Sequence, residues 1–265
     1  MKLIDLFRKP KKHRTVEGKT SLILAHHDVD LFLDVGANVG QTGQMLRRWD
    51  YAGKIISFEP VISCYEQLVA AASNDALWEV NERTALGDCD DMVEMMVSGA
   101  SDLSSLSPPT DALKSALPRT ETIQHDRVPI HRLDTLFPNG FKDASRPFLK
   151  IDAQGHDMAV LQGAEGIMDS IFGIQIEMSL LPLYEGEPNY LEILNYLHEL
   201  GFVPHLMTER TFARRINRQL QIDGVLSVRF LIAEPGRQEN KTLSQSFAQL
   251  EPKPGQRIKP PGPSR

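Results

Sequence analysis

Short apolar runs recur along the chain and predict the strands of a buried sheet. Residues 31–35, 54–58, 147–152 and 173–178 are each five or six residues long and mostly apolar, as expected of strands that are covered on both faces. Each run has an acidic residue near its end or directly after it. The pattern predicts a buried sheet with carboxylates gathered at the carboxyl ends of its strands.

Stretches with a helical spacing of apolar residues separate these runs. We expect helices from 62 to about 72, from 156 to about 170 and over 189–202, the last closed by Gly201 as a C-cap. This alternation predicts an α/β, Rossmann-like fold with a mostly parallel central sheet of about seven strands and helices on both faces. A further strand and its exit loop are expected at 77–88, and the other strands at 91–98, 203–207 and 224–233.

The composition fits one large enzyme domain. The chain has 265 residues, 41% of them hydrophobic and 24% charged, which is enough to bury a single core. We expect this domain at residues 20–233, after a basic tail at 1–19 and before a polar tail with several Pro and Gly residues at 234–265 that does not order itself. The net charge of −6 argues against a general nucleic-acid binder.

Targeting and redox features are few. No apolar stretch approaches the length of a membrane span, and the two cysteines match neither a disulfide framework nor a metal pattern. We therefore expect a cytoplasmic protein without a transmembrane segment. The basic N-terminus leaves a weak peripheral contact with a membrane open.

The segment DVGANVGQT at 34–42 has the features of a ligand-binding loop. Asp34 ends the first strand run, and Gly36 and Gly40 frame a loop in which the backbone tolerates positive φ and close approach of a ligand. Asn38 is another residue type that adopts left-handed geometry. A helix is expected after Gly40, so its first amides face the loop and suit an anionic group.

Two cofactors compete for this loop. A dinucleotide favours Gly-x-Gly-x-x-Gly, but counting from Gly36 places Asn38 and Gln41 at the second and third glycine positions. The alternative pattern, acid-x-Gly-x-(Gly/Asn)-x-Gly, is that of the S-adenosylmethionine (SAM) loop of class I methyltransferases. Asp34, Gly36, Asn38 and Gly40 fit the four defined positions of this pattern, so the spacing favours SAM.

Glu59 supports an adenosine ligand of either kind. It follows the second strand run, 25 residues after Asp34, which is about the offset of the carboxylate that binds the ribose in dinucleotide folds. A carboxylate there accepts charge-assisted hydrogen bonds from both ribose hydroxyls. NAD and SAM share this ribose, so Glu59 does not choose between them.

Several further motifs resemble those of FkbM-type methyltransferases, SAM-dependent enzymes that mainly methylate hydroxyl groups. The resemblance covers about residues 29–229 and rests on DVGANVGQT at 34–42, FEP at 58–60, ALGD at 85–88, SDLSSL at 101–106, HRLDTLF at 131–137, FLKIDAQGHDMAVLQGA at 148–164, IQIEMSLLPLYEG at 174–186 and QIDGVLSVR at 221–229. With the loop pattern, it implies SAM bound by Asp34, Gly36, Ala37, Asn38, Gly40, Glu59, Pro60 and Asp88.

The chain departs from the family pattern at one motif. Where the family commonly reads Lys-Ile-Asp-x-Glu-Gly-x-Glu, this chain has Gln154 and Asp157. A glutamine neither accepts a proton nor binds a cation as a glutamate does. We therefore assign no catalytic role to Gln154 and expect no metal.

Methyl transfer to a hydroxyl requires an oriented acceptor and benefits from a base. The candidate catalytic residues are Lys150, Asp152, His156 and Glu177, which lie at or after two of the predicted strands. Lys150 and Asp152 leave the same face of a strand, and His156 opens the next helix. An acid, a base and a cation are therefore expected around one point.

The roles of these residues stay open. Asp152 is a candidate to take a proton, to orient SAM or, with Glu177, to hold Mg²⁺. His156 is a candidate general base because its pKa range suits proton transfer. The structural alternatives are an ion pair between Lys150 and Glu177 and a His156 that only starts its helix.

The acceptor is not specified by the sequence. The resemblance implies a sugar hydroxyl in a glycan or glycolipid first and a natural product second, with peptide or amine acceptors also open. We expect residues 100–127, a long connection, and 179–189, which include Tyr184, to select it. An NAD-dependent oxidoreductase and a SAM-binding protein without turnover remain alternatives.

Overall fold

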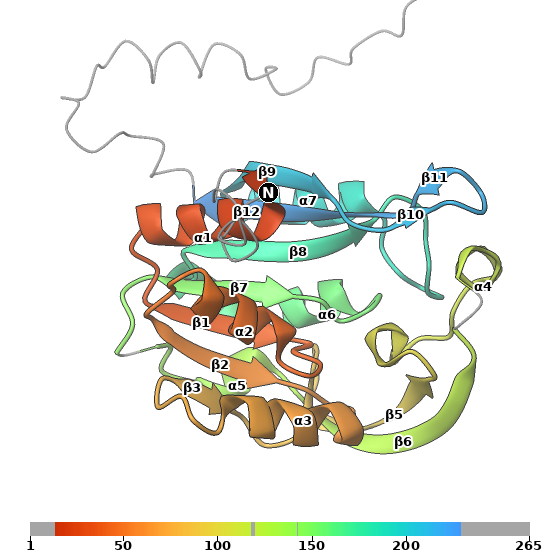
Figure 1. The fold of residues 1–265 in the computed structure, drawn as a ribbon, viewed down its shortest axis with the longest axis horizontal. Helices are drawn as coiled ribbons and strands as arrows, with labels where there is room; N and C mark the ends of the chain where they lie inside the picture. Colours follow the sequence, from red (N-terminus) through yellow and green to blue (C-terminus); the bar gives the residue numbers. More distant parts are fainter. Residues whose placement is uncertain (1–13, 118–119, 142, 229–265) are drawn as a thin grey trace, which may run out of the picture. The chain divides into compact units, whose positions relative to one another are not determined.

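A seven-stranded sheet organises the part of the chain described by the computed structural model, residues 14–228 without 118, 119 and 142 (Figure 1). Its strand order is β3-β2-β1-β7-β8-β12-β9. The strands are β1 (Leu31–Val35), β2 (Lys54–Phe58), β3 (Trp78–Val80), β7 (Pro147–Ile151), β8 (Gly173–Ser179), β9 (Phe202–Glu209) and β12 (Gln221–Val228).

The pairing is parallel in the centre of the sheet and antiparallel at one side. Strands β3, β2, β1, β7 and β8 run parallel to one another, whereas β12 runs antiparallel to both β8 and β9. The register places Asp34 of β1 opposite Lys150 of β7. The expected Rossmann-like fold is confirmed, and the four apolar runs form four adjacent central strands.

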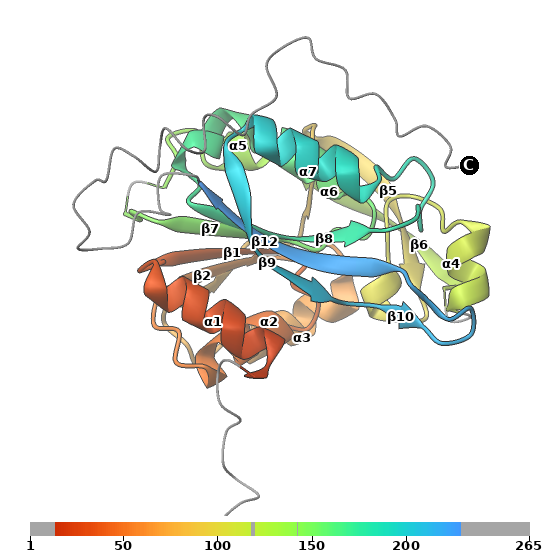
Figure 2. The ribbon, with the colours of Figure 1, turned by 90° about the horizontal axis from the view of Figure 1, so that it is seen from above.

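Helices cover both faces of the sheet (Figure 2). One face carries α1 (Val16–His26), α2 (Gln41–Arg48) and α3 (Ile62–Ala72). The other carries α5 (Leu133–Leu136), α6 (Asp157–Gln162) and α7 (Tyr190–Glu199). The start of α7 is fixed by a capping box between Asn189 and Glu192, and Gly201 follows its end with a φ of +89°.

The main apolar core lies between the sheet and the helices that follow β7 and β8. Leu33, Leu149 and Ile176 point from three adjacent strands into one cluster with Val160 and Leu197 of α6 and α7. All five side chains are fully buried. Burial of such side chains is the main favourable term in folding. This core therefore holds together the strands whose carboxyl ends carry the site.

A second sheet stands at the carboxyl ends of the central strands. It has the order β4-β6-β5, from β4 (Ala85–Leu86), β6 (Thr122–His131) and β5 (Asp91–Ser98). The segment 77–88, expected as one strand and its exit loop, therefore contains β3 of the central sheet and β4 of the second sheet. The prediction of a long connection at 100–127 was wrong in part. This segment contains η3 (Ser101–Leu103), α4 (Asp111–Ala116) and the first half of β6.

A short hairpin and a broken helix were also not predicted. Strands β10 (Phe212–Ala213) and β11 (Arg218–Gln219) pair as a hairpin between β9 and β12. The helix expected at 156–170 is divided into α6 and η4 (Glu165–Ser170). The division falls at Gly163, where a Cβ atom would overlap the carbonyl oxygen of Gly87.

The ends of the expected domain need one correction. Helix α1 begins at Val16, inside the segment expected as a tail at 1–19, because the Thr15 side chain caps it through the amide of Gly18. Residues 1–13, the last part of the strand expected at 224–233 and the expected tail at 234–265 lie outside the described residues. Among the helices that are described, none has the length and apolar character needed to cross a membrane.

Candidate active site

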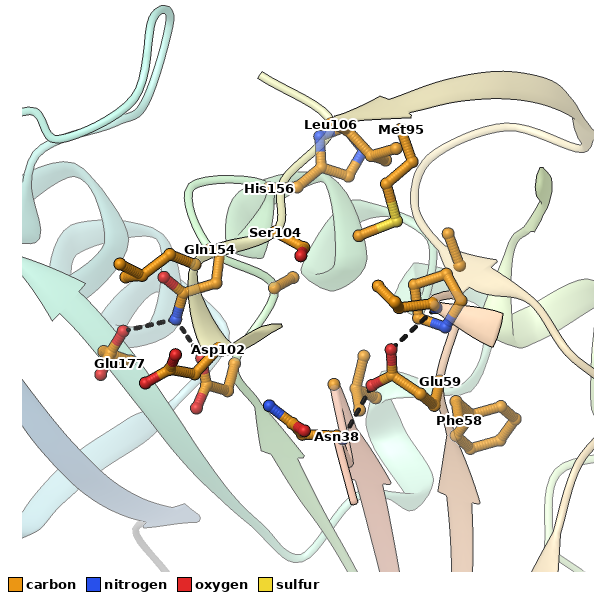
Figure 3. Close-up of a pocket in the computed structure, with 18 of the residues that line it drawn as sticks. Asn38, Phe58, Glu59, Met95, Asp102, Ser104, Leu106, Gln154, His156 and Glu177 are labelled. Carbon is orange, nitrogen blue, oxygen red and sulfur yellow. Dashed lines mark hydrogen bonds between the residues drawn. The ribbon is translucent and has the colours of Figure 1, made fainter. Parts of the chain in front are cut away.

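A cavity of about 800 Å³ lies at the carboxyl ends of the central strands (Figure 3), within the range typical of ligand pockets. We call its sheet-end residues the floor: Gly36, Asn38, Glu59, Asp152 and Glu177. The cap is formed by residues 91–117 and the hairpin segment 210–219. Its lining side chains include Met95, Asp102, Leu103, Ser104, Leu106, Leu117 and Arg210.

The loop after β1 is shaped by residues with positive φ. Gly36 has a φ of +69°, and a Cβ atom there would overlap the backbone carbonyl oxygen of Asp152. Only glycine fits this approach of the loop to the end of β7. Asn38 and Gly40 have φ values of +49° and +86°, and Gly40 is the N-cap of α2. The loop therefore presents its backbone to the cavity.

Glu59 is held rigidly at the end of β2. Its Oε2 accepts a hydrogen bond from the amide of Asn38 at 2.7 Å, and its Oε1 accepts one from the amide of Val61 at 2.8 Å. The side chain lines the cavity, and burial raises its pKa to about 7. Each oxygen keeps lone-pair capacity for a further donor, as a ribose-binding carboxylate requires.

Asp34 and Lys150 lie beneath the loop. Both side chains are buried and neither lines the cavity. The Nζ atom of Lys150 lies 3.2 Å from Oδ1 of Asp34 and donates to the carbonyl oxygens of Val35 and Gly36. Burial alone would lower the pKa of Lys150. The carboxylates of Asp34 and Asp152 nevertheless hold this pKa above its ordinary value. Lys150 therefore tethers the loop as a cation.

Gln154 joins two carboxylates of the floor. Its Nε2 atom donates to Oδ1 of Asp152 at 2.6 Å and to Oε2 of Glu177 at 3.1 Å (Figure 3). Its Oε1 atom accepts a hydrogen bond from the Tyr184 hydroxyl at 2.9 Å, and its carbonyl oxygen accepts one from Ser105 at 2.6 Å. The φ of Gln154 is +48°, a conformation that costs energy for a residue other than glycine.

Arg210 completes this cluster from the cap. Its guanidinium donates to Oε1 of Glu177 at 2.9 Å and to Oδ2 of Asp152 at 3.4 Å. Gln221 also donates to Glu177. Burial raises the pKa of Glu177 well above its ordinary value, and the neighbouring Asp152 adds to this shift. The two carboxylates are therefore surrounded by amide and guanidinium donors.

Arg210 lies in none of the motifs found in the sequence, and Gln221 opens the motif at 221–229 without being assigned a role there. Each lies at an end of the antiparallel pair β9 and β12 rather than after a parallel strand. The ion pair between Lys150 and Glu177, which stood as a structural alternative, is not formed among the described residues. Lys150 pairs with Asp34 and Asp152, and Glu177 pairs with Arg210.

His156 lies in another part of the cavity. It lines the wall next to Met95 and Leu106 (Figure 3). Within the described part of the chain no hydrogen bond or ion pair joins His156 to Asp152, and its Nε2 atom is buried without a hydrogen-bond partner. Burial lowers its pKa, so the ring is neutral near pH 7. Asp152 and Lys150, the acid and the cation expected around one point, lie close together. His156, the expected base, lies apart from them.

The remaining predicted cofactor residues occupy different places. Pro60 lines the cavity. Ala37 is buried and donates its amide to the carbonyl of Phe58, and Gly40 packs against Leu68 and Trp78 at the start of α2. Asp88 is exposed and does not line the cavity. Their contacts with a cofactor stay predictions.

The fold is similar to that of solved structures of very different sequence. The magnesium protoporphyrin IX methyltransferase (ChlM) of Synechocystis PCC 6803 with bound SAM is 8% identical, covers 82% of this chain and 80% of its own, and has a TM-score of 0.43. A putative methyltransferase, yhhF, of Escherichia coli is 12% identical, with 83% and 90% covered and a TM-score of 0.40. Likenesses this low do not indicate a substrate. No curated protein sequence matches the chain.

The sequence matches one family model. The model is described as the methyltransferase FkbM domain, and the match covers residues 34–204. This range begins at Asp34 near the end of β1 and includes the whole floor. Because the match spans more than half of the chain, the protein belongs to the FkbM methyltransferase family.

Proposed function

We propose that this methyltransferase transfers a methyl group from SAM to a hydroxyl group, with Asp152 as the general base. The observation that carries the proposal is the pair of carboxylates at the floor, held by Gln154 beside the loop after β1. A hydroxyl acceptor must lose a proton when it is methylated. Asp152 lines the cavity and offers a fixed oxygen for that proton.

The shape of the floor supports SAM as the cofactor. Gly36 has no side chain where the loop approaches Asp152, so the loop presents its backbone to the cavity. Glu59 is oriented by two backbone amides. We propose that Glu59 binds the ribose hydroxyls and that Gly36 and Asn38 contact the amino-acid end. Asp34 and Lys150 act from below by holding this loop in place. SAM supplies a carbon that its sulfonium group has already activated for displacement.

The donors around Asp152 favour its base role over that of Glu177. Glu177 accepts three side-chain hydrogen bonds, and its raised pKa favours the protonated form. Asp152 accepts one hydrogen bond from Gln154 and a longer one from Arg210, and its Oδ2 atom lies 3.7 Å from the Lys150 ammonium. His156 is the second candidate base, because its ring lines the cavity and burial keeps it neutral.

The same donors support a mechanism without a metal ion. The Gln154 amide bridges Asp152 and Glu177, and Arg210 bridges the same two residues from the cap. A divalent cation would have to displace both bridges to bind these oxygens. We therefore propose that acceptor positioning, rather than metal binding, is the task of this cluster.

The polar lining supports an acceptor with several hydroxyls, of the sugar or glycan type, with other natural products second. Asp102, Gln154, Arg210 and Gln221 line the cavity, and they present carboxylate, amide and guanidinium groups that bind neighbouring hydroxyls. Asp102 is exposed and forms no hydrogen bond or ion pair with any other residue that the structure describes. It is free to bind an acceptor.

A methyl-uptake assay tests this function. The protein is incubated with SAM carrying a labelled methyl group and with fractionated glycans, glycolipids, natural products, peptides and amines, and the labelled product is analysed for the methylated atom. We expect label on oxygen in the glycan or natural-product fractions, lost in Asp152→Asn. Label on nitrogen would overturn the hydroxyl acceptor. SAM binding without transfer to any fraction would favour a SAM-binding protein without turnover.

A further inference from the structure

The hairpin of the cap carries an unusual concentration of positive charge. Residues 210–219, RTFARRINRQ, contain four arginines and no acidic residue, in a chain whose net charge is −6. The segment is therefore a local basic feature of an acidic chain. Arg210 precedes β10, Arg214 and Arg215 lie in the turn, and Arg218 lies in β11.

Three of the four arginines have no side-chain partner among the residues that the structure describes. Arg210 is engaged by Glu177 and Asp152 in the cavity. Arg214, Arg215 and Arg218 are exposed, and none of them forms an ion pair or side-chain hydrogen bond with any residue that the structure describes. Their guanidinium groups are available to an external anion.

The hairpin is anchored through one set of side chains and exposes another. Ala213 and Leu220 are buried in a cluster with Leu113 of α4. Phe212 and Ile216 are 45% and 43% exposed although both are large and apolar. Figures 1 and 2 both show the hairpin extending past the end of the central sheet, on the side of α4. It therefore projects arginines and apolar side chains together.

We propose that this hairpin docks on the surface of an anionic lipid membrane. Arginines pair with lipid phosphates and attract the negative surface potential, while exposed apolar side chains enter the interface. RNA would also pair with the arginines and could stack one base on Phe212, but the aliphatic Ile216 offers no stacking surface, whereas a membrane interface takes up both side chains. Glu209, which precedes the hairpin and is exposed, only partly offsets the charge.

Docking would bring the cavity to the membrane. Arg210 and Thr211, at the base of the hairpin, line the cavity together with the floor. If the proposed hydroxyl methylation is correct, the acceptor would then be a hydroxyl carried on a lipid. This last step rests on the proposed function, whereas the docking itself does not.

Vesicle sedimentation of the full chain tests the docking. The probes are vesicles of phosphatidylcholine alone and of phosphatidylcholine with an equal amount of phosphatidylglycerol. We expect binding to the anionic vesicles only, weakened by added salt. Replacing Arg214, Arg215 and Arg218 by Gln should lower the partition coefficient by about 100-fold, at roughly fivefold per arginine. In Phe212→Trp, anionic vesicles should shift the emission to the blue.

A matched triple variant separates the hairpin from general charge. Arg14, Lys19 and Arg127 are also exposed but lie outside the hairpin, and their replacement by Gln should change the partition coefficient little. Equal losses in both triples, or no loss in the hairpin triple, would overturn the proposal. So would tighter binding of a short single-stranded RNA than of anionic vesicles at the same salt. SAM titration of each variant shows separately whether the cofactor site is intact.

Discussion

The floor and the cap of the cavity are built in different ways. The floor consists of residues at the ends of parallel strands buried on both faces, and Gly36, Glu59 and Asp152 are fixed there by backbone contacts. The cap consists of strand β5 of the second sheet, a six-residue helix and a two-strand hairpin, packed through the cluster that contains Leu113 and Leu220. We infer that the floor holds the cofactor and performs the chemistry, whereas the cap selects the acceptor.

The largest expected effect is on the floor. Asp152→Asn removes the proposed base while keeping the shape of the side chain, so turnover should fall by about 10²–10⁴-fold. SAM affinity, measured by calorimetry, should change much less. The control is Asp111→Asn, an exposed acid of α4 in the cap, which should leave turnover unchanged. Unchanged turnover in Asp152→Asn would place the chemistry elsewhere and favour His156.

Glu59→Gln should act on the cofactor and not on the cap. The variant loses the charge that the ribose hydroxyls would bind and one of two acceptors for the amides of Asn38 and Val61. We expect SAM to bind more than about tenfold more weakly, because hydrogen bonds to charged groups contribute roughly 1.5–3 kcal/mol. Glu66→Gln, at an exposed position of α3, is the matched control. Equal SAM affinity in a folded Glu59→Gln protein would remove Glu59 from the cofactor site.

The pH dependence of SAM binding should follow Glu59. Burial raises its pKa to about 7 in the free protein, and the ionised form is the stronger acceptor for ribose hydroxyls. SAM affinity should therefore rise from about pH 6 to about pH 8, by up to roughly tenfold, and proton release on binding should be measurable in buffers of different ionisation enthalpy. Glu59→Gln should flatten the profile. A SAM affinity that falls from about pH 6 to about pH 8 would contradict the expected direction of this pH dependence.

The smallest effect is expected in the cap. Thr110 caps α4 through the amide of Leu113 and donates to the carbonyl of Leu183. Thr110→Ala should loosen α4 by about 1 kcal/mol, which raises the acceptor KM about fivefold and leaves SAM affinity unchanged. Thr15→Ala removes the same kind of cap from α1 and should change neither the acceptor KM nor the SAM affinity. If Thr110→Ala weakened SAM binding instead, the cap would belong to the cofactor site.

The floor was predictable from the sequence because strong local signals converge on it. The loop spacing from Asp34 to Gly40 and the acids after buried runs depend only on neighbours in the chain. The cap was not predictable in the same way. The first half of β6 is exposed and shows no apolar alternation, and the hairpin segment is mostly polar. Arg210 reaches Glu177 across 33 residues of sequence, and no local pattern indicates such a contact.

His156 shows where a correct motif gave an incomplete placement. Its position at the start of α6 was predicted, but the ring lies near Met95 and Leu106 of the cap (Figure 3) and forms no hydrogen bond with Asp152 in the described part of the chain. The direction of the side chain depends on the packing of Gly87, because a Cβ atom there would lie 2.9 Å from Nε2 of His156. Such contacts between distant segments cannot be deduced from the spacing of residues alone.

The most direct test of the central claim is a pair of calorimetric titrations of the wild-type protein, one with SAM and one with NAD. The floor should bind one SAM per chain through Glu59 and the loop after β1, and NAD should give no binding at the same concentrations. The same SAM titration of Glu59→Gln should show the loss described above. NAD binding that exceeds SAM binding, or no SAM binding by the folded protein, would contradict the account.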